Sequence, residues 1–423
     1  MKFGIGQPMR RHEDLRLVTG RGRYTDDITL PGMAHAFVLR APVAHAHIKR
    51  IDATAARRMP GVLFVATGED VRANGLGDVP CMVPLVNRDG TPRRDTPRPV
   101  LALGKVRHVG QPVALVVAET FNAARDAAEA IVIEYDQLPA VTGAKDAIAA
   151  GVAQLFDHIP GNIVFDWDND MGDAKATEAA FAKASRVVTL ELINNRLVVN
   201  SMEPRNAIAD YDREGGRSTL YTATQGVHFV RDPLAEAVLK IPKDRLRVIT
   251  PNVGGAFGMK AFVYPEHALV VWASRKLERP VKWQEDRSEG FVSDNQGRDH
   301  RTRAELALDE TGRFRLAGFD PCESWRLSVA VWLLRADTFD RSRLRSLFDW
   351  GDSRERQRRL YQHRAGLRLS RRGTTRGRIP ARAPRRRRGT RTQHQPGRNP
   401  PRQFRAAVGD ALHIGDHALA RFR

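Results

Sequence analysis

The pattern of hydrophobic and polar positions predicts an α/β fold over most of the chain. Short apolar runs at residues 34–42 and 61–70 predict strands, and residues 111–140 predict a strand, a helix and a second strand. Apolar positions in that helix recur at helical spacing. The strands beside it are rich in Val and Ile, as expected of sheet residues buried against a helix. Residues 86–100 are polar and Pro-rich and predict a surface loop.

A second α/β region is predicted to begin near Gly161. Its expected helices are residues 173–185, 228–240 and 264–277, and its expected strands are residues 186–193, 217–224 and 245–250. Residues 305–314 still alternate like a strand that leads into a turn. After Phe314 neither the helical nor the strand period persists, so the ordered fold is expected to stop there.

Charge separates this tail from the rest of the chain. The protein has 69 Lys and Arg against 49 Asp and Glu, a formal net charge of +20. Residues 315–423 hold 27 Arg, no Lys and nine acidic residues, so the part before them is nearly neutral. A surface selected for phosphate binding normally mixes Lys with Arg, since either cation neutralises a phosphate. The excess of Arg over Lys indicates a bias in the coding sequence. Because the tail is so polar, it is also expected to be disordered.

Composition is typical of a globular protein, with 42% hydrophobic residues. No apolar run approaches the roughly 18 residues of a membrane span, and the N-terminus lacks the apolar core of a signal peptide. A cytoplasmic location without an integral membrane segment is therefore expected. Cys81 and Cys322 are too few for a disulfide framework or a cysteine-based metal site.

The richest local signal is a β-branched strand that runs into a glycine-rich loop and then a helix, residues 247–277. Gly254, Gly255 and Gly258 allow positive φ angles and a close backbone approach to a ligand, so that loop N–H groups can face an anion or a metal-bound oxygen. The loop is neither G-x-G-x-x-G nor a Walker sequence, which argues against nucleotide binding by motif. Taken alone, a structural turn is the simpler interpretation.

Two other groups of polar residues are weaker candidates. His45 and His47 could ligate zinc from one face of a strand, but no third ligand is evident and a structural role is the better interpretation. Asp166–Asp173 lacks the glycine and the closing glutamate of a calcium loop, so a solvated acidic turn is expected.

Four stretches of the chain, in this order, resemble the molybdopterin-binding large subunit of the molybdenum hydroxylases, the family that contains xanthine dehydrogenase, aldehyde oxidase and aerobic carbon monoxide dehydrogenase. They are residues 10–52, "HVGQPVALVVAE", "NSMEPRNAIADYD" and residues 222–260. The resemblance implies an α/β (α+β) fold. Its expected parts are an N-terminal segment (1–19), an α/β hammerhead domain (20–137), a linker (138–160), the first part of a molybdopterin-binding domain (161–314) and a tail outside the family (315–423).

The resemblance also implies the site residues. Gln225 matches the glutamine whose side-chain amide hydrogen-bonds an oxo ligand of molybdenum, a role that suits a neutral donor. The family's Gly-Gly-Phe-Gly loop, which packs beside the metal and offers backbone amides to the cofactor, corresponds to Gly254, Gly255, Ala256, Phe257 and Gly258. Ala256 stands where glycine is commonest, which requires a position that tolerates a Cβ. No residue of this chain is expected to ligate the metal directly.

Three further positions refine this picture. Ala261 stands where xanthine-type members carry a substrate-contacting glutamate, so a purine substrate is disfavoured. Glu203 and Arg205 also match the family, and an ion-pairing, loop-ordering role is expected for them.

The implied cofactor is molybdenum on a molybdopterin dinucleotide, in its cytosine form. The implied partners are an iron–sulfur subunit and an FAD subunit in a hetero-oligomer that oxidises a small molecule, carbon monoxide, an aldehyde or an N-heterocycle, with oxygen from water. The family's general-base glutamate lies close to the C-terminus and is not recognisable here. The catalytic residues are thus unknown, and the chain is expected to be incomplete and inactive.

Nucleic-acid binding through the basic tail is the alternative function. It would require interleaved aromatic residues for base stacking, and the last part of the tail holds only Tyr361, Phe404 and Phe422. A nucleic-acid partner is therefore not expected.

A frameshift is our hypothesis for the origin of the tail. One choice of codons for Cys322–Ser328, read one base later, encodes Ala-Asn-Leu-Gly-Ala-Tyr-Leu, which resembles the segment that follows in the family. A shift between Phe314 and Cys322 would explain the missing Lys, the excess Arg and Pro and the lost periodicity together.

Overall fold

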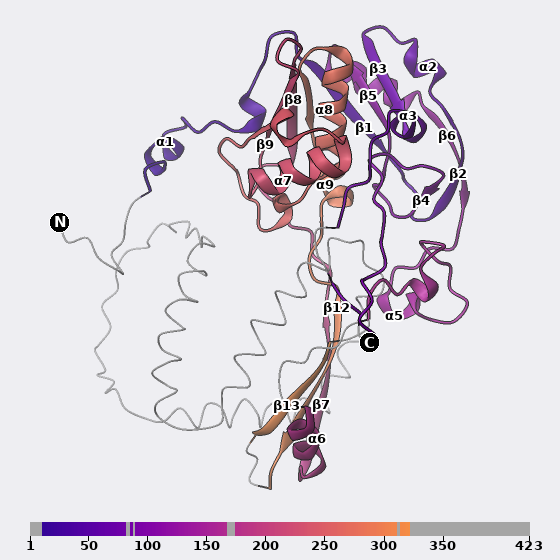
Figure 1. Cartoon of the computed structure of the whole chain (residues 1–423), viewed down its shortest axis with the longest axis vertical. Coiled ribbons are helices and arrows are strands. Elements are labelled where there is room, and N and C mark those ends of the chain that lie inside the picture. The colour runs from indigo at the N-terminus through magenta and orange to yellow at the C-terminus, as the bar shows by residue number, and fades with distance from the viewer. Residues whose placement is uncertain (1–10, 82–84, 88, 167–173, 311–313, 322–423) are drawn as a thin grey trace, which may run out of the picture. The chain divides into compact units, whose positions relative to one another are not determined.

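The computed structural model describes most of the chain before residue 322, and the described ranges are 11–81, 85–87, 89–166, 174–310 and 314–321. Most of the predicted tail therefore lies outside the described residues. Strands and helices are interspersed along the described part (Figure 1), which confirms the mixed α/β fold class.

The largest sheet has seven strands in the order β10-β9-β8-β11-β1-β5-β3. The strands are β1 (Ala34–Arg40), β3 (Val62–Thr67), β5 (Pro112–Ala118), β8 (Asn206–Asp212), β9 (Arg217–Thr222), β10 (Leu246–Ile249) and β11 (Val281–Gln284). The central pair is parallel, with Ala34 opposite Val281. The sheet therefore crosses the boundary that the sequence predicts between residues 20–137 and 161–314.

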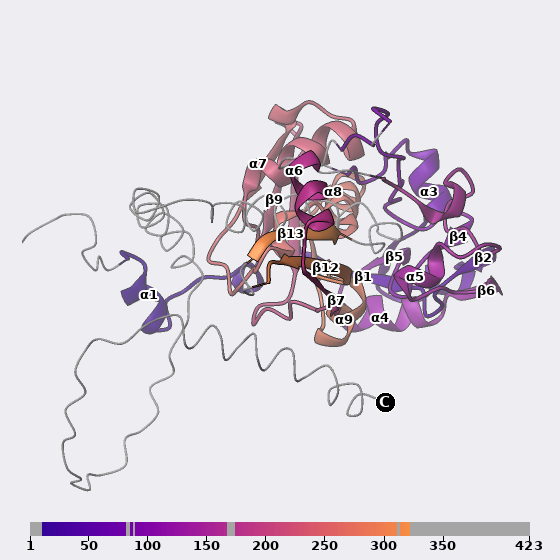
Figure 2. The ribbon, with the colours of Figure 1, turned by 90° about the horizontal axis from the view of Figure 1, so that it is seen from below.

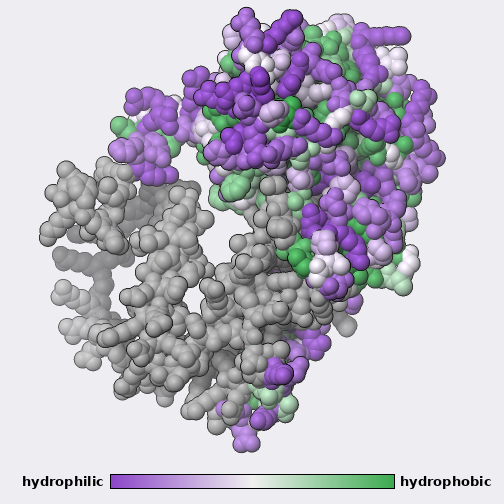
Figure 3. All heavy atoms as spheres, viewed as in Figure 1, coloured by the Kyte–Doolittle hydropathy of each residue, from purple (hydrophilic) through white to green (hydrophobic). Residues whose placement is uncertain are grey.

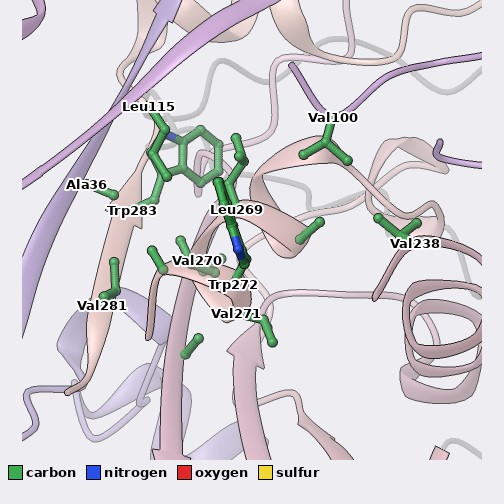
Figure 4. Close-up of a cluster of buried hydrophobic side chains, with 14 of the residues drawn as sticks. Ala36, Val100, Leu115, Val238, Leu269, Val270, Val271, Trp272, Val281 and Trp283 are labelled. Carbon is green, nitrogen blue, oxygen red and sulfur yellow. The ribbon is translucent and has the colours of Figure 1, made fainter. Parts of the chain in front are cut away.

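One helix, buried on nearly all sides, covers one face of this sheet. In α8 (Pro265–Leu277) the first ten residues are all buried, as is typical of a helix inside a core. Leu269 and Trp272 of α8 lie in the same buried cluster as Trp283 of β11 and Leu115 of β5 (Figure 4). α3 (Gly68–Ala73), α7 (Val227–Pro233) and a π-helical turn (Leu234–Leu239) also contribute to this cluster. The core thus combines residues from both expected domains.

A second buried cluster lies under α4 (Phe121–Glu129) and α2 (Thr54–Arg57). Thr120 begins α4, because its hydroxyl accepts a hydrogen bond from the backbone of Ala123 at 3.2 Å. The buried face of α4 consists of Ala124, Ala127 and Ala128, which let the helix pack closely on β1 and β5. The predicted helix and its small-residue face are present.

Two three-stranded sheets complete the described fold. One has the order β4-β2-β6 and contains β2 (Ala46–Asp52), β4 (Lys105–Val106) and β6 (Val132–Gln137). The other has the order β13-β12-β7 and contains β7 (Arg186–Asn194), β12 (His300–Leu308) and β13 (Phe314–Pro321). Figure 2 shows α6 (Ala174–Ala182) beside β13, which it contacts. The remaining α-helices of the described part are α1 (Asp14–Val18), α5 (Ala144–Ala147) and α9 (Arg287–Ser293).

The structure departs from the expected elements in several places. β13 continues past Phe314 to Pro321, in antiparallel register with β12, because backbone pairing with a neighbouring strand does not require alternating side chains. The expected helix at residues 228–240 changes from α to π geometry after Pro233. The loop at residues 86–100 is exposed over most of residues 89–95, as expected, but Arg98 bridges Val79 and residues 96–100 lie against the core.

Hydrophilic side chains dominate the described surface in the view of Figure 3. Among the described residues, no helix combines the length and the apolar character that crossing a membrane requires.

Candidate functional site

The glycine-rich loop between β10 and α8 has an unusual backbone. Gly255 and Gly258 have φ angles of +99° and +90°, and Phe257 between them has a φ of +49°. A positive φ is strained for a bulky residue, and such strain is often found at functional sites. The Phe257 side chain is nevertheless 64% exposed. The loop therefore holds a strained backbone and an exposed aromatic ring together.

Gln225 lies directly against this loop. Its side-chain oxygen Oε1 accepts a hydrogen bond from the backbone N–H of Gly258 at 2.8 Å. Since the backbone N–H must face the amide oxygen, the orientation of the amide group is fixed. The amino group Nε2 donates to no described residue and is available to a ligand. The structure thus brings together two positions that the sequence assigns to one site.

A buried ion pair connects the loop to the preceding segment. Lys260 is 2% exposed, and its Nζ lies 2.9 Å from Oε2 of Glu203 and 2.8 Å from the backbone oxygen of Glu203. The same Oε2 accepts a hydrogen bond from the Gly254 backbone at 2.8 Å. Burial lowers the pKa of Lys260, while Glu203 acts in the opposite direction. The backbone oxygen of Lys260 also accepts from the backbone N–H of Gln225 at 3.1 Å, so Lys260 links three chain segments.

The glycines are required by neighbouring protein atoms. A Cβ at Gly254 would lie 2.6 Å from Cβ of Glu203, and one at Gly255 would lie 2.9 Å from the ring of Phe257. Within the described chain, the backbone N–H groups of Gly255 and Ala256 donate to no residue, whereas those of Gly254 and Gly258 are used internally. Ala256 does not have a positive φ, so its Cβ is tolerated.

Arg205 lies in a different, fully buried cluster. Its guanidinium donates to Glu266 at 2.8 Å, to Glu285 at 2.6 Å and to Asp294 at 2.6 Å. It also lies over the ring of Tyr264, 3.9 Å from the centroid. Burial alone would lower the pKa of Arg205, but these carboxylates raise it well above its usual value. Glu203 and Arg205 therefore both form ion pairs, as expected, but with different partners.

Arg40 of β1 extends this cluster. Its Nη2 lies 2.6 Å from Glu266 and 2.6 Å from Glu289. Burial raises the pKa of Glu289 to about 7, and Arg40 counteracts this only in part. The cluster joins the first expected domain to the second.

Of the two weaker metal candidates, the structure describes the histidine pair and only the start of the acidic turn. His45 is buried with its Nδ1 2.9 Å from the backbone oxygen of Pro139, whereas His47 is exposed. In the described part of the chain no three His, Cys, Asp or Glu residues are placed to hold a metal ion. Residues 167–173 of the acidic turn lie outside the described ranges.

Family comparisons agree with this arrangement. Residues 19–139 match the model of the aldehyde oxidase and xanthine dehydrogenase a/b hammerhead domain. Residues 155–320 match the model of the molybdopterin cofactor-binding domain. The chain belongs to the aldehyde oxidase and xanthine dehydrogenase family. The second match ends inside β13, beyond the expected boundary at Phe314.

The curated relatives of this family member include large subunits of bacterial enzymes. The carbon monoxide dehydrogenase large chain of Hydrogenophaga pseudoflava is 36% identical over 313 residues, which cover 71% of this chain and 37% of that protein. The nicotine 6-hydroxylase large subunit of Paenarthrobacter nicotinovorans is 36% identical over 309 residues, which cover 73% of this chain and 36% of that protein. The chain thus spans little more than a third of the length of these relatives.

Solved structures agree as well. Quinoline 2-oxidoreductase from Pseudomonas putida 86 superposes with a TM-score of 0.68 at 39% identity, over 75% of this chain and 39% of that chain. A Cu,Mo-containing carbon monoxide dehydrogenase superposes with a TM-score of 0.67 at 30% identity, over 76% of this chain and 41% of that chain. The family models end at residue 320, so these comparisons give no support to nucleic-acid binding through the tail.

Sequence reasoning proposed Gln225 and the glycine loop as site residues but assigned no role to Lys260, which the structure places beside them. The available signal was a single lysine between small and apolar residues in "GAFGMKAFVY". A lysine is almost never fully buried without a partner, and that partner, Glu203, is far away in the sequence.

Proposed function

We propose that this chain carries the hammerhead domain and the first part of the molybdopterin-binding domain of a molybdenum hydroxylase large subunit. The intact enzyme would oxidise a small molecule with oxygen from water. The relatives are named for carbon monoxide and nicotine, and the substrate is proposed to be of the same general kind, carbon monoxide, an aldehyde or an N-heterocycle.

One observation supports this proposal most directly. Three donors without an acceptor in the described structure gather at one place: Nε2 of Gln225 and the backbone N–H groups of Gly255 and Ala256. Such donors suit a ligand with acceptor oxygens and negative charge, which is the chemistry of a pterin phosphate with an oxidised metal. The residues present therefore fit the group that the family binds.

These residues would hold the cofactor, and Lys260 would position them. Gln225 would orient the cofactor through Nε2, because Gly258 fixes the other end of its amide. Glu203 and Lys260 would keep the glycine loop in the strained conformation in which Gly255 and Ala256 present their N–H groups. When bound, the cofactor would supply two-electron oxidation chemistry that no side chain of this site provides.

The same proposal extends to the form of the cofactor and to the partner subunits. The cofactor would be molybdenum on molybdopterin cytosine dinucleotide. The partners would be an iron–sulfur subunit and an FAD subunit in a cytoplasmic hetero-oligomer. Since the matched part is 37% of a carbon monoxide dehydrogenase large chain, the isolated chain is expected to lack hydroxylase activity.

Cofactor content tests the proposal without an activity assay. The full chain would be produced in a bacterial host supplied with molybdate, and molybdenum and pterin would be measured by elemental analysis and by fluorescence of the oxidised pterin. The Gln225→Glu variant retains the oxygen that Gly258 needs but replaces the Nε2 donor with a charge. Outer-shell substitutions in metal sites commonly cost roughly 10- to 100-fold in affinity, so pterin content should fall at least tenfold.

The Gln137→Glu variant is the matched control, since Gln137 is an exposed residue at the end of β6. It should retain the wild-type pterin content. Hydrolysis of bound cofactor should release cytidine monophosphate. Equal pterin content in the Gln225 and Gln137 variants, or none in the wild type, would contradict the proposal.

A further inference from the structure

A separate cavity of about 80 Å³ lies where the segment before β4, the linker after α5 and the start of α8 meet. Its walls include Arg98, Arg107, Gln111, Phe156 and Glu266, and it includes none of the proposed cofactor-binding residues. A cavity of this size has room for several water molecules. It can therefore hold a small ligand.

The walls supply more hydrogen-bond donors than the protein uses. The backbone oxygen of Arg98 accepts from Val79 at 2.9 Å, which fixes the chain, but its guanidinium donates to no described residue. Arg107 donates from Nε to the Leu155 oxygen at 3.0 Å and lies 4.6 Å from the ring of Phe156, and its Nη2 is unused within the described ranges.

Gln111 adds a further donor to the cavity wall. The residue is 5% exposed, and its Oε1 accepts a hydrogen bond from the backbone N–H of Arg107 at 2.8 Å. As with Gln225, this contact fixes the orientation of the amide, so Nε2 is the free end. No described residue accepts from it. A donor in a cavity wall that no protein group uses can bind either water or a ligand with acceptor oxygens.

The cavity walls also carry excess positive charge. Glu266 is the carboxylate among the lining residues, and its two oxygens are already engaged by Arg40 at 2.6 Å and Arg205 at 2.8 Å. Arg40, Arg98 and Arg107 all line the cavity. Several guanidinium groups therefore act on the same small space.

We propose that this cavity is a binding site for one small oxyanion of the phosphate or sulfate class. Arg98 is suited to bind two oxygens at once, because its planar fork matches such an anion. Gln111 and Arg107 would donate to the remaining oxygens. The site is independent of the proposed cofactor function, since it shares no residue with the glycine loop or Gln225.

Titration calorimetry of the full chain with inorganic phosphate tests the proposal. Ionic strength is held constant with chloride, so that general screening does not change. The wild type should bind one phosphate saturably, and acetate should bind more weakly because it offers fewer oxygens. Loss of charged hydrogen bonds corresponds to roughly a 10- to 100-fold change in affinity, which is the weakening expected for Arg98→Gln.

Arg213→Gln is the matched control, because Arg213 is exposed and paired with Glu278 at 2.8 Å. It should bind phosphate like the wild type. Arg98→Lys retains the charge without the fork and should bind with intermediate affinity. Thermal melts in phosphate-free buffer should coincide for the wild type and Arg98→Gln, since the Arg98 side chain has no described partner.

Three binding results would overturn the proposal: no saturable phosphate binding by the wild type, equal weakening in the Arg213 variant, or tighter binding of acetate than of phosphate. A low melting temperature of Arg98→Gln without phosphate would also overturn it, because Arg98 would then serve packing.

Discussion

Replacing Lys260 with methionine tests whether the buried ion pair holds the candidate site together. The change keeps the length and apolar stem of the side chain but removes Nζ, which lies 2.9 Å from Oε2 and 2.8 Å from the backbone oxygen of Glu203. Glu203 would retain only the hydrogen bonds from neighbouring groups such as the Gly254 backbone. Its side chain is 9% exposed, so water can replace the missing cation only in part.

The expected loss of stability follows from this geometry. Removing one partner of a buried pair costs about 3–5 kcal/mol, and partial access of water to Glu203 favours the lower value, about 3 kcal/mol. For a fold of this size, each 1 kcal/mol lowers the melting temperature by roughly 2–4 °C. Lys260→Met should therefore melt about 6–12 °C below the wild type. Urea unfolding should show the same loss at an unchanged slope.

Two further variants distinguish the loss of the ion pair from the general effect of replacing a lysine with methionine. Lys276→Met makes the same substitution at an exposed position of α8 and should change stability by less than about 0.5 kcal/mol. The double variant Lys260→Met/Glu203→Gln removes both charges and should recover about 1–3 kcal/mol of coupling energy. Faster hydrogen exchange at the Gly254 amide should accompany the single Lys260 change. A Lys260 variant as stable as the Lys276 variant, with unchanged exchange at Gly254, would refute the reasoning.

Three other predictions concern the loop, the buried cluster and the tail. Gly255→Ala should lose at least about 1 kcal/mol more in urea unfolding than Gly20→Ala, because both have positive φ but only Gly255 has neighbours within 4 Å. Glu289 has a folded pKa raised by burial to about 7, above its usual 4.5, so the native state binds more protons and stability should fall as pH rises from about 4.5 to 7. Glu289→Gln should flatten that fall, and an unchanged pH profile would exclude the assignment. Resequencing the gene between the codons for Phe314 and Cys322 should reveal a base inserted or lost, whereas an intact frame would exclude the frameshift.

Local periodicity predicted the elements well because it reflects which side of each element is buried. The strands at residues 34–42 and 245–250 and the helix at residues 264–277 lie where the sequence places them. The order of strands in the sheet could not be predicted in this way. The pairing of β1 with β11 joins Ala34 to Val281, and neither local pattern contains information about the other.

The candidate site was predictable as far as single positions match a family pattern. Gln225 and Gly258 were assigned to one site, and the structure places them in hydrogen-bond contact at 2.8 Å. The reason for the glycines was not predictable, because Gly254 and Gly255 make room for Glu203 and Phe257. Which side chain fills the space beside a glycine depends on tertiary packing, which a sequence read in isolation does not show.

The buried cluster around Arg205 shows that tertiary packing brings together charged residues from distant parts of the sequence. Glu266, Glu285, Glu289 and Asp294 come from α8 and the segment after it. Among the described residues they pair with two guanidinium groups, those of Arg205 and of Arg40 in β1. Burial also raises the pKa of Asp294 to about 6. Unpaired negative charge is costly in an apolar interior. Burial therefore favours the protonated forms of Glu289 and Asp294, which offsets part of the excess of carboxylates over guanidinium groups, and Arg40 couples β1 to the segment after α8.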